Sequence, residues 1–260
     1  MRTPTAGTTG AARGTRAAAR RSPRLYAVTL TALGLLTTLV SCTSPPAPLT
    51  TACGVVVDGS GSGASSNEGF DAEGKLKATL LTFLDDEGCG TVDFAPITRA
   101  SQSSSCRVEG VDLDPPHKET TDQESQRRKA RNVAAGRSLE ELKCARSQNG
   151  SDVWGALDRI ATTLPPDSSG AKLLVVSDFA QADPDFVLSM PKIASEEQRT
   201  EAVDSLVAER GVPGIKGMNV YPVGFGMQFK AKPGQFEDFE AFWLEILEGR
   251  AKAHVHTDYR

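Results

Sequence analysis

The sequence predicts an α/β protein whose central sheet is mostly parallel and is flanked by helices. Three observations support this prediction. Short aliphatic or β-branched runs alternate along the chain with longer segments of helical spacing, which is the pattern of parallel strands joined by crossover helices. Two of the apolar runs end on an aspartate, Asp58 and Asp178. Glycine or proline residues separate many of the successive segments.

Each element follows from hydrophobic spacing and from the residues that interrupt it. In the first half, a valine run and two later segments predict strands at 55–57, 91–97 and, at a sheet edge, 106–113. Apolar residues at helical spacing, and then a polar charged stretch, predict helices at 70–84 and 119–146. We expect the second of these helices to be solvated along most of its length.

The second half repeats the alternation. Ser151 or Asp152 is expected to cap a helix with a clear apolar stripe, which Pro165 and Pro166 end. Strands are expected at 172–177, 218–224 and 253–257, and helices at 151–164, 196–210 and 235–247. Phe and Trp side chains of the last helix are expected to face inward.

The front of the chain is expected to be a targeting segment. Residues 1–41 contain six arginines and no acidic residue, and they include an apolar run that ends just before Cys42. This arrangement resembles a bacterial lipoprotein signal. We therefore expect a signal peptide at 1–41, a lipid on Cys42, a flexible tether at 42–51 and one domain at 52–260. Acyl chains such as palmitate would hold the protein on the extracytoplasmic face of the cell membrane. The apolar run is short for a membrane span, and Arg20-Arg21 leaves open export by the Sec or the twin-arginine route.

The charge of the remaining chain excludes one class of partner. Residues 1–41 hold six of the 29 basic side chains, which leaves 23 against 33 acidic ones and a net charge of −10. A protein with no basic surface to neutralise phosphates is a poor candidate for binding nucleic acid.

Four cysteines remain after Cys42, an even number that predicts two disulfides in an exported protein. Cys53 and Cys89 each lie beside a predicted strand, so adjacent parallel strands would bring them together. We expect the pairs Cys53–Cys89 and Cys106–Cys144, although three pairings are possible.

Oxygen-bearing side chains are expected to meet at one edge of the sheet. Asp58 and Asp178 end strands, Ser60 and Ser62 follow Asp58 at alternate positions, and Ser151 opens a helix at the same edge. Ligands of open α/β sheets bind at the carboxyl ends of the strands, and hard cations such as Mg²⁺ prefer oxygen ligands. The spacing Gly59-x-Gly61 also fits a dinucleotide loop, but Asp58 directly before it would repel a pyrophosphate.

These segments, in this order, resemble the von Willebrand factor A family. The resemblance rests on Asp58-x-Ser60-x-Ser62 after a valine strand, on Gly150-Ser151-Asp152-Val153 and on Leu174-Val175-Val176-Ser177-Asp178. It implies a Rossmann-like, doubly wound domain with a metal ion-dependent adhesion site. Ser60, Ser62 and Ser151 would bind the metal through their hydroxyls, with Asp58 and Asp178 acting largely through water or hydrogen bonds. Two departures from the family are Ser151, usually threonine, and Phe179, commonly glycine.

The resemblance implies a binding protein and not an enzyme. A domain of this kind would bind Mg²⁺, or Mn²⁺ or Ca²⁺, and through it a carboxylate on a protein partner. No small-molecule substrate is expected. Two alternatives remain open: an accessory envelope lipoprotein of this fold without a working metal site, and a subunit or chaperone of an enzyme complex.

Overall fold

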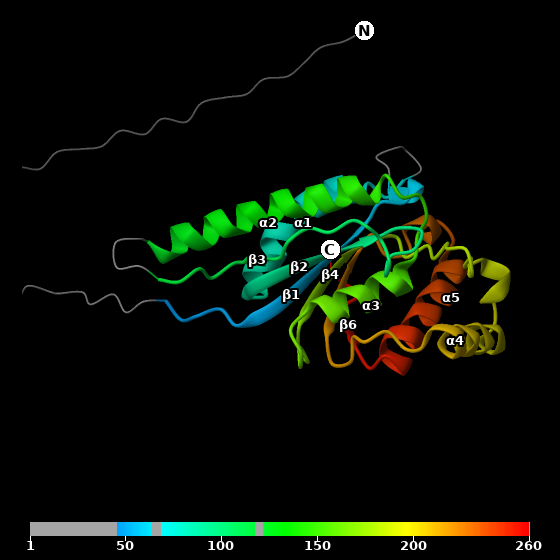
Figure 1. Ribbon diagram of the computed structural model, residues 1–260. Coiled ribbons are helices and arrows are strands. Elements are labelled where there is room, and N and C mark those ends of the chain that lie inside the picture. The colour runs from blue at the N-terminus through cyan, green and yellow to red at the C-terminus, as the bar shows by residue number, and fades with distance from the viewer. Residues whose placement is uncertain (1–45, 64–68, 118–121, 260) are drawn as a thin grey trace, which may run out of the picture. The chain divides into compact units, whose positions relative to one another are not determined.

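The computed structural model describes residues 46–63, 69–117 and 122–259 (Figure 1). The predicted signal peptide at 1–41 and the predicted lipid site, Cys42, lie outside the described residues. A six-stranded sheet with the order β3-β2-β1-β4-β5-β6 forms the centre. The strands are β1 Thr51–Asp58, β2 Cys89–Ile97, β3 Val111–Asp112, β4 Lys172–Val176, β5 Asn219–Val223 and β6 His254–Val255.

All strand pairs are parallel except the edge pair β2–β3. The prediction of an α/β protein with a mostly parallel sheet is therefore confirmed. The helices are α1 Ala72–Asp86, α2 Gln123–Ala145, α3 Val153–Thr163, α4 Glu196–Arg210 and α5 Pro233–Leu244, which a π-helical segment Glu245–Arg250 continues.

Helices cover both faces of the sheet (Figure 1). Val55 and Val57 pack with α1 and α2 on one face, whereas Val56 packs with α3, α4 and α5 on the other. This alternation follows from the two-residue period of a strand. Because both faces are buried, the central strands contain almost continuous apolar runs, as in other fully covered parallel sheets.

The edge strand is shorter than expected, because the chain from Ser101 to Cys106 is held as a loop. The Arg159 guanidinium of α3 donates to the carbonyls of Ser101 and Ser104, each at 2.9 Å, and to that of Cys106. Only Val111 and Asp112 pair with β2, so the expectation of a strand over all of 106–113 is wrong.

Helix α2 is also more buried than its polar sequence suggests. Seven of its residues are buried, and the helix packs on α1, β1 and β2. Arg127 is accommodated because its Nε donates to Asp114 at 2.7 Å and its Nη2 donates to the carbonyl of Ala47 at 2.6 Å. The expectation of a solvated helix therefore holds for one side, which has exposed residues from Glu124 to Lys143, and misses the side that packs on the sheet.

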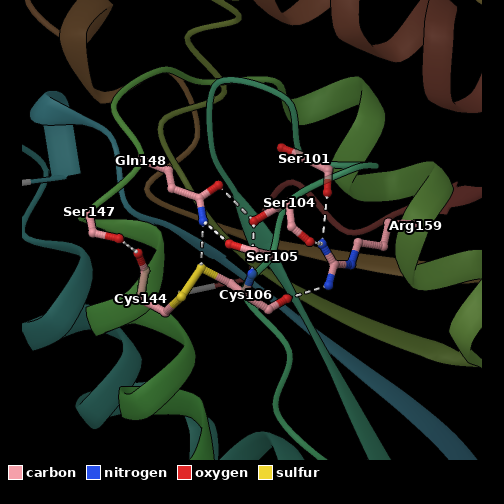
Figure 2. Close-up of a disulfide and its surroundings, with 8 residues drawn as sticks. All are labelled: Ser101, Ser104, Ser105, Cys106, Cys144, Ser147, Gln148 and Arg159. Atoms are coloured by element: carbon pink, nitrogen blue, oxygen red, sulfur yellow. Dashed lines mark hydrogen bonds between the residues drawn. A yellow bond between two sulfur atoms is a disulfide. The ribbon is translucent and has the colours of Figure 1, made fainter.

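Both predicted disulfides are present, in the predicted pairing. Cys53 of β1 bonds to Cys89 of the neighbouring parallel strand β2, and Cys106 bonds to Cys144 near the end of α2. Figure 2 shows the second disulfide beneath Gln148, whose Nε2 donates to Cys106 Sγ at 3.2 Å.

Residues before Ala52, the expected start of the domain, already contact the domain. The Leu49 amide donates to Asp114 at 2.8 Å, and the Ala47 carbonyl accepts from Arg127. Among the described residues, no helix has the length and apolar character needed to cross a membrane.

Candidate functional site

The first loop of the predicted site is a tight turn at the carboxyl end of β1. Asp58 is fully buried. Its Oδ1 accepts from the Ser60 amide at 2.8 Å, so the carboxylate itself folds the loop back. The hydroxyls of Ser60 and Ser62 lie 2.9 Å apart. A short 3₁₀ turn at Gly61–Gly63 follows, and both serine hydroxyls are consequently presented on one side of the loop.

The second loop begins where the neighbouring strand β4 ends. Ser177 Oγ donates to Asp58 Oδ2 at 2.6 Å and accepts from the Phe179 amide at 2.9 Å. Asp178 is buried, and its Oδ1 accepts from the Ala180 amide at 3.0 Å. The first two loops are therefore joined side chain to side chain.

The third loop places Ser151 at the start of α3. Gly150 has a φ of 139° and lies against the backbone of Arg99, so a Cβ at this position would clash. Ser151 forms a two-way backbone pair with Ala182, at 2.8 and 2.7 Å. Ala182 lies four residues beyond Asp178, and this pair anchors the third loop to the second.

The Ser151 side chain is buried without a hydrogen-bond partner among the described residues. Asp152, and not Ser151, caps α3 by accepting from the Gly155 amide at 2.9 Å. This resolves the capping alternative and leaves the Ser151 hydroxyl unused, although a buried polar atom without a partner costs about 1–3 kcal/mol.

The two carboxylates repel each other in a dry environment. Burial, and next the charge of Asp178, raise the pKa of Asp58 from 3.8 to about 6. Burial also raises the pKa of Asp178. A cation between or beside them would oppose both effects, because it restores a favourable environment to the charged form.

Among the predicted ligands, hydrogen bonds join Asp58, Ser60 and Ser62, and Ser177, which precedes Asp178, donates to Asp58. Ser151 is linked to them only through backbone pairing. Sequence reasoning did not single out Ser177, although a hydroxyl directly before a strand-end aspartate was visible. It also missed three side chains that hold the third loop together with Asp152: Gln181, Asp183 and Arg210.

Arg210 at the end of α4 organises these side chains. Its guanidinium donates twice to Asp183, at 2.7 and 3.0 Å, and lies 3.6 Å from Asp152. Gln181 donates to Asp152 at 3.3 Å and to Asp183, and accepts from the Trp154 amide at 3.1 Å. Bidentate arginine–carboxylate pairs fix geometry as well as charge, so this network sets the position of the Ser151 turn.

The Cys106–Cys144 disulfide lies between the first and third loops. On one side, Cys144 precedes Ala145, whose backbone is packed so closely on Gly59 that a Cβ there would overlap it. On the other side, the loop that ends at Cys106 begins at Ser101. The Ser101 hydroxyl donates to the Asp152 carbonyl at 2.6 Å (Figure 2 shows Ser101 and the disulfide).

Within residues 46–63, 69–117 and 122–259, no three His, Cys, Asp or Glu side chains cluster as metal ligands. The candidate site has a different donor set, two carboxylates and three hydroxyls. This set fits a hard cation that binds oxygen and keeps some of its water.

The raised pKa of Asp58 predicts how the metal-free protein responds to pH. The folded state keeps the proton on Asp58 up to about pH 6, whereas the unfolded chain releases it near 3.8. Unfolding therefore releases a proton in this window, and the free energy of unfolding should fall by up to about 3 kcal/mol between about pH 4 and 6. Urea unfolding in EDTA measures this slope. Asp58→Asn should reduce it, and an unchanged slope in that variant would contradict the assignment.

No protein-family model matches this chain. No curated protein sequence matches it either. These comparisons therefore assign the chain to no family.

Proposed function

We propose that residues 52–260 form a doubly wound, von Willebrand factor A-like domain whose metal ion-dependent site binds a protein partner. The strand order β3-β2-β1-β4-β5-β6 with helices on both faces supports this proposal. So does the position of the candidate site, at the carboxyl ends of β1 and β4, where ligands of such sheets bind.

One observation carries the metal proposal: the Ser151 hydroxyl, at the same sheet edge as two buried carboxylates, is buried and has no partner in the described part of the chain. A divalent cation would use the unpaired oxygen and offset the repulsion between Asp58 and Asp178. We propose Mg²⁺ as the cation, with Mn²⁺ or Ca²⁺ as substitutes. Ser60, Ser62 and Ser151 would bind it through their hydroxyls.

The partner would supply the last ligand in the coordination shell of the cation. Three of the five proposed side chains are neutral hydroxyls, so the bound metal keeps an affinity for an additional anionic oxygen. A carboxylate of another protein would supply it. With a lipid on Cys42, the domain would act at the extracytoplasmic face of the membrane, as a binding protein and not as an enzyme.

Calorimetry on the full chain in detergent tests the cation site. Wild type should bind one Mg²⁺, Asp58→Ala should show no binding, and Ser151→Ala should weaken binding about tenfold, or 1.4 kcal/mol. Ser205→Ala, on the exposed side of α4, is the matched control and should bind as wild type does. Equal Mg²⁺ binding by wild type and Asp58→Ala would refute the site.

A pull-down from membrane extract, with and without EDTA, then separates the proposal from its alternatives. A partner that is released by EDTA supports metal-dependent binding. A partner that remains would favour an accessory envelope protein or a subunit of a larger complex.

A further inference from the structure

A cavity lies beside the candidate cation site. It has a volume of about 350 Å³, within the range of small-ligand sites. Its lining includes Lys75 of α1, Gly224 and Phe225 after β5, Lys230, and Phe236 and Glu237 of α5.

The floor of this cavity is continuous with the cation site. Gly226 donates its amide to the Asp178 carbonyl at 3.2 Å. Gly224 has a φ of 97°, and a Cβ there would lie 3.1 Å from the Ser177 carbonyl oxygen and 2.9 Å from the Phe70 ring. The segment from Gly224 to Gly226 therefore contacts the Asp178 loop on one side and lines the cavity on the other. Glycine at 224 keeps the backbone and the Phe70 ring in close contact.

The walls combine an apolar surface with an excess of positive charge. Phe225, Phe236 and Pro233 supply the apolar part. Lys75 and Lys230 supply two ammonium groups, and neither forms an ion pair with any described residue. Glu237 is the one acidic residue of the lining. A protein with a net charge of −10 outside its front segment thus presents a locally positive hollow at this point.

We propose that this cavity receives a large apolar side chain of the acidic partner, with a second partner carboxylate facing Lys75 and Lys230. The partner segment would carry one acid for the cation, then an aromatic or large aliphatic residue, then another acid. This inference rests on the proposed function, which supplies the first contact and the acidic character of the partner. Charge complementarity selects the occupant, because a partner that binds through a carboxylate is already acidic.

Synthetic peptides test the proposal on the full chain in detergent. The probe is a fluorescent peptide in which one, two or three glycines separate an aspartate from a Phe-Asp pair. Its matched control replaces phenylalanine by alanine. In Mg²⁺, the phenylalanine peptide with the best spacing should bind about tenfold more tightly than its alanine control, because the cavity buries the ring.

Two variants identify the surface. Lys75→Gln combined with Lys230→Gln should weaken the phenylalanine peptide about fivefold and leave Mg²⁺ affinity unchanged. Lys216→Gln, an exposed lysine outside the lining, should change neither. Amide shifts of Gly224 and Phe225 in NMR spectra should follow the phenylalanine peptide and not the alanine peptide.

The outcomes separate this proposal from the cation site. If Mg²⁺ binds but phenylalanine and alanine peptides bind equally, or neither binds, the cavity proposal is overturned and the cation site stands. If Mg²⁺ does not bind but the phenylalanine peptide still binds in a lysine-dependent way in EDTA, the cation site fails and the cavity stands. Equal binding of a peptide with lysine in place of both aspartates would also overturn the proposal.

Discussion

Removing the Cys106–Cys144 disulfide, by Cys106→Ser with Cys144→Ser, is expected to lower the free energy of unfolding by about 4 kcal/mol. The two cysteines are 38 residues apart, and closing a loop of this length removes about that much entropy from the unfolded chain. Urea unfolding followed by circular dichroism measures the change. A loss below 1 kcal/mol would show that the unfolded chain is not constrained in this way.

The other disulfide is a matched control. Cys53–Cys89 spans 36 residues, so Cys53→Ser with Cys89→Ser should destabilise the protein by a similar amount. It ties two strands that are already paired along their length. Cys106–Cys144, in contrast, links two segments that contact the candidate site: Ala145 packs on Gly59, and Ser101 donates a hydrogen bond to Asp152. Calorimetry should be done under conditions where both double variants stay folded. We expect the variant without Cys106–Cys144 to bind Mg²⁺ several-fold more weakly than wild type, and the variant without Cys53–Cys89 to bind it as wild type does.

Local patterns were sufficient to predict most of the fold. Strands that are buried on both faces have apolar runs, and the helices α1, α3 and α5 have apolar stripes, so their places follow from spacing alone. The disulfide pairing followed from the order of the strands. Asp58 and Asp178 were found because Asp58 ends one such strand and Asp178 follows another by two residues, and parallel strands bring their carboxyl ends to one edge.

What the sequence did not predict depends on contacts between distant segments. Arg210 lies 27 residues beyond Asp183, and nothing in its local sequence indicates that it holds the Ser151 turn. The burial of α2 has the same origin, because Arg127 reaches Asp114 and Ala47 through tertiary folding. Whether Ser151 or Asp152 caps α3 is likewise set by the pairing of Ser151 with Ala182.

Phe179 joins the site to the core at the position where the resembling family commonly has glycine. Its φ of 61° is left-handed, a conformation that costs a residue with a Cβ about 1 kcal/mol. Its fully buried ring packs edge-on against Phe225 at 5.0 Å and Trp243 at 5.3 Å between centroids. Its carbonyl accepts from the Trp243 indole at 3.1 Å. Packing on two aromatic rings therefore offsets the backbone cost.

Phe179→Ala should accordingly lower the free energy of unfolding by about 3–5 kcal/mol, since it removes the ring and leaves a cavity. Phe179→Gly removes the same ring but also relieves the left-handed backbone, so it should be about 1 kcal/mol more stable than the alanine variant. Urea unfolding of the two variants beside wild type separates packing from backbone strain. Equal stabilities of the alanine and glycine variants would show that the backbone at 179 is not strained. A loss below 1 kcal/mol in both would show that the ring does not hold the second loop against α5.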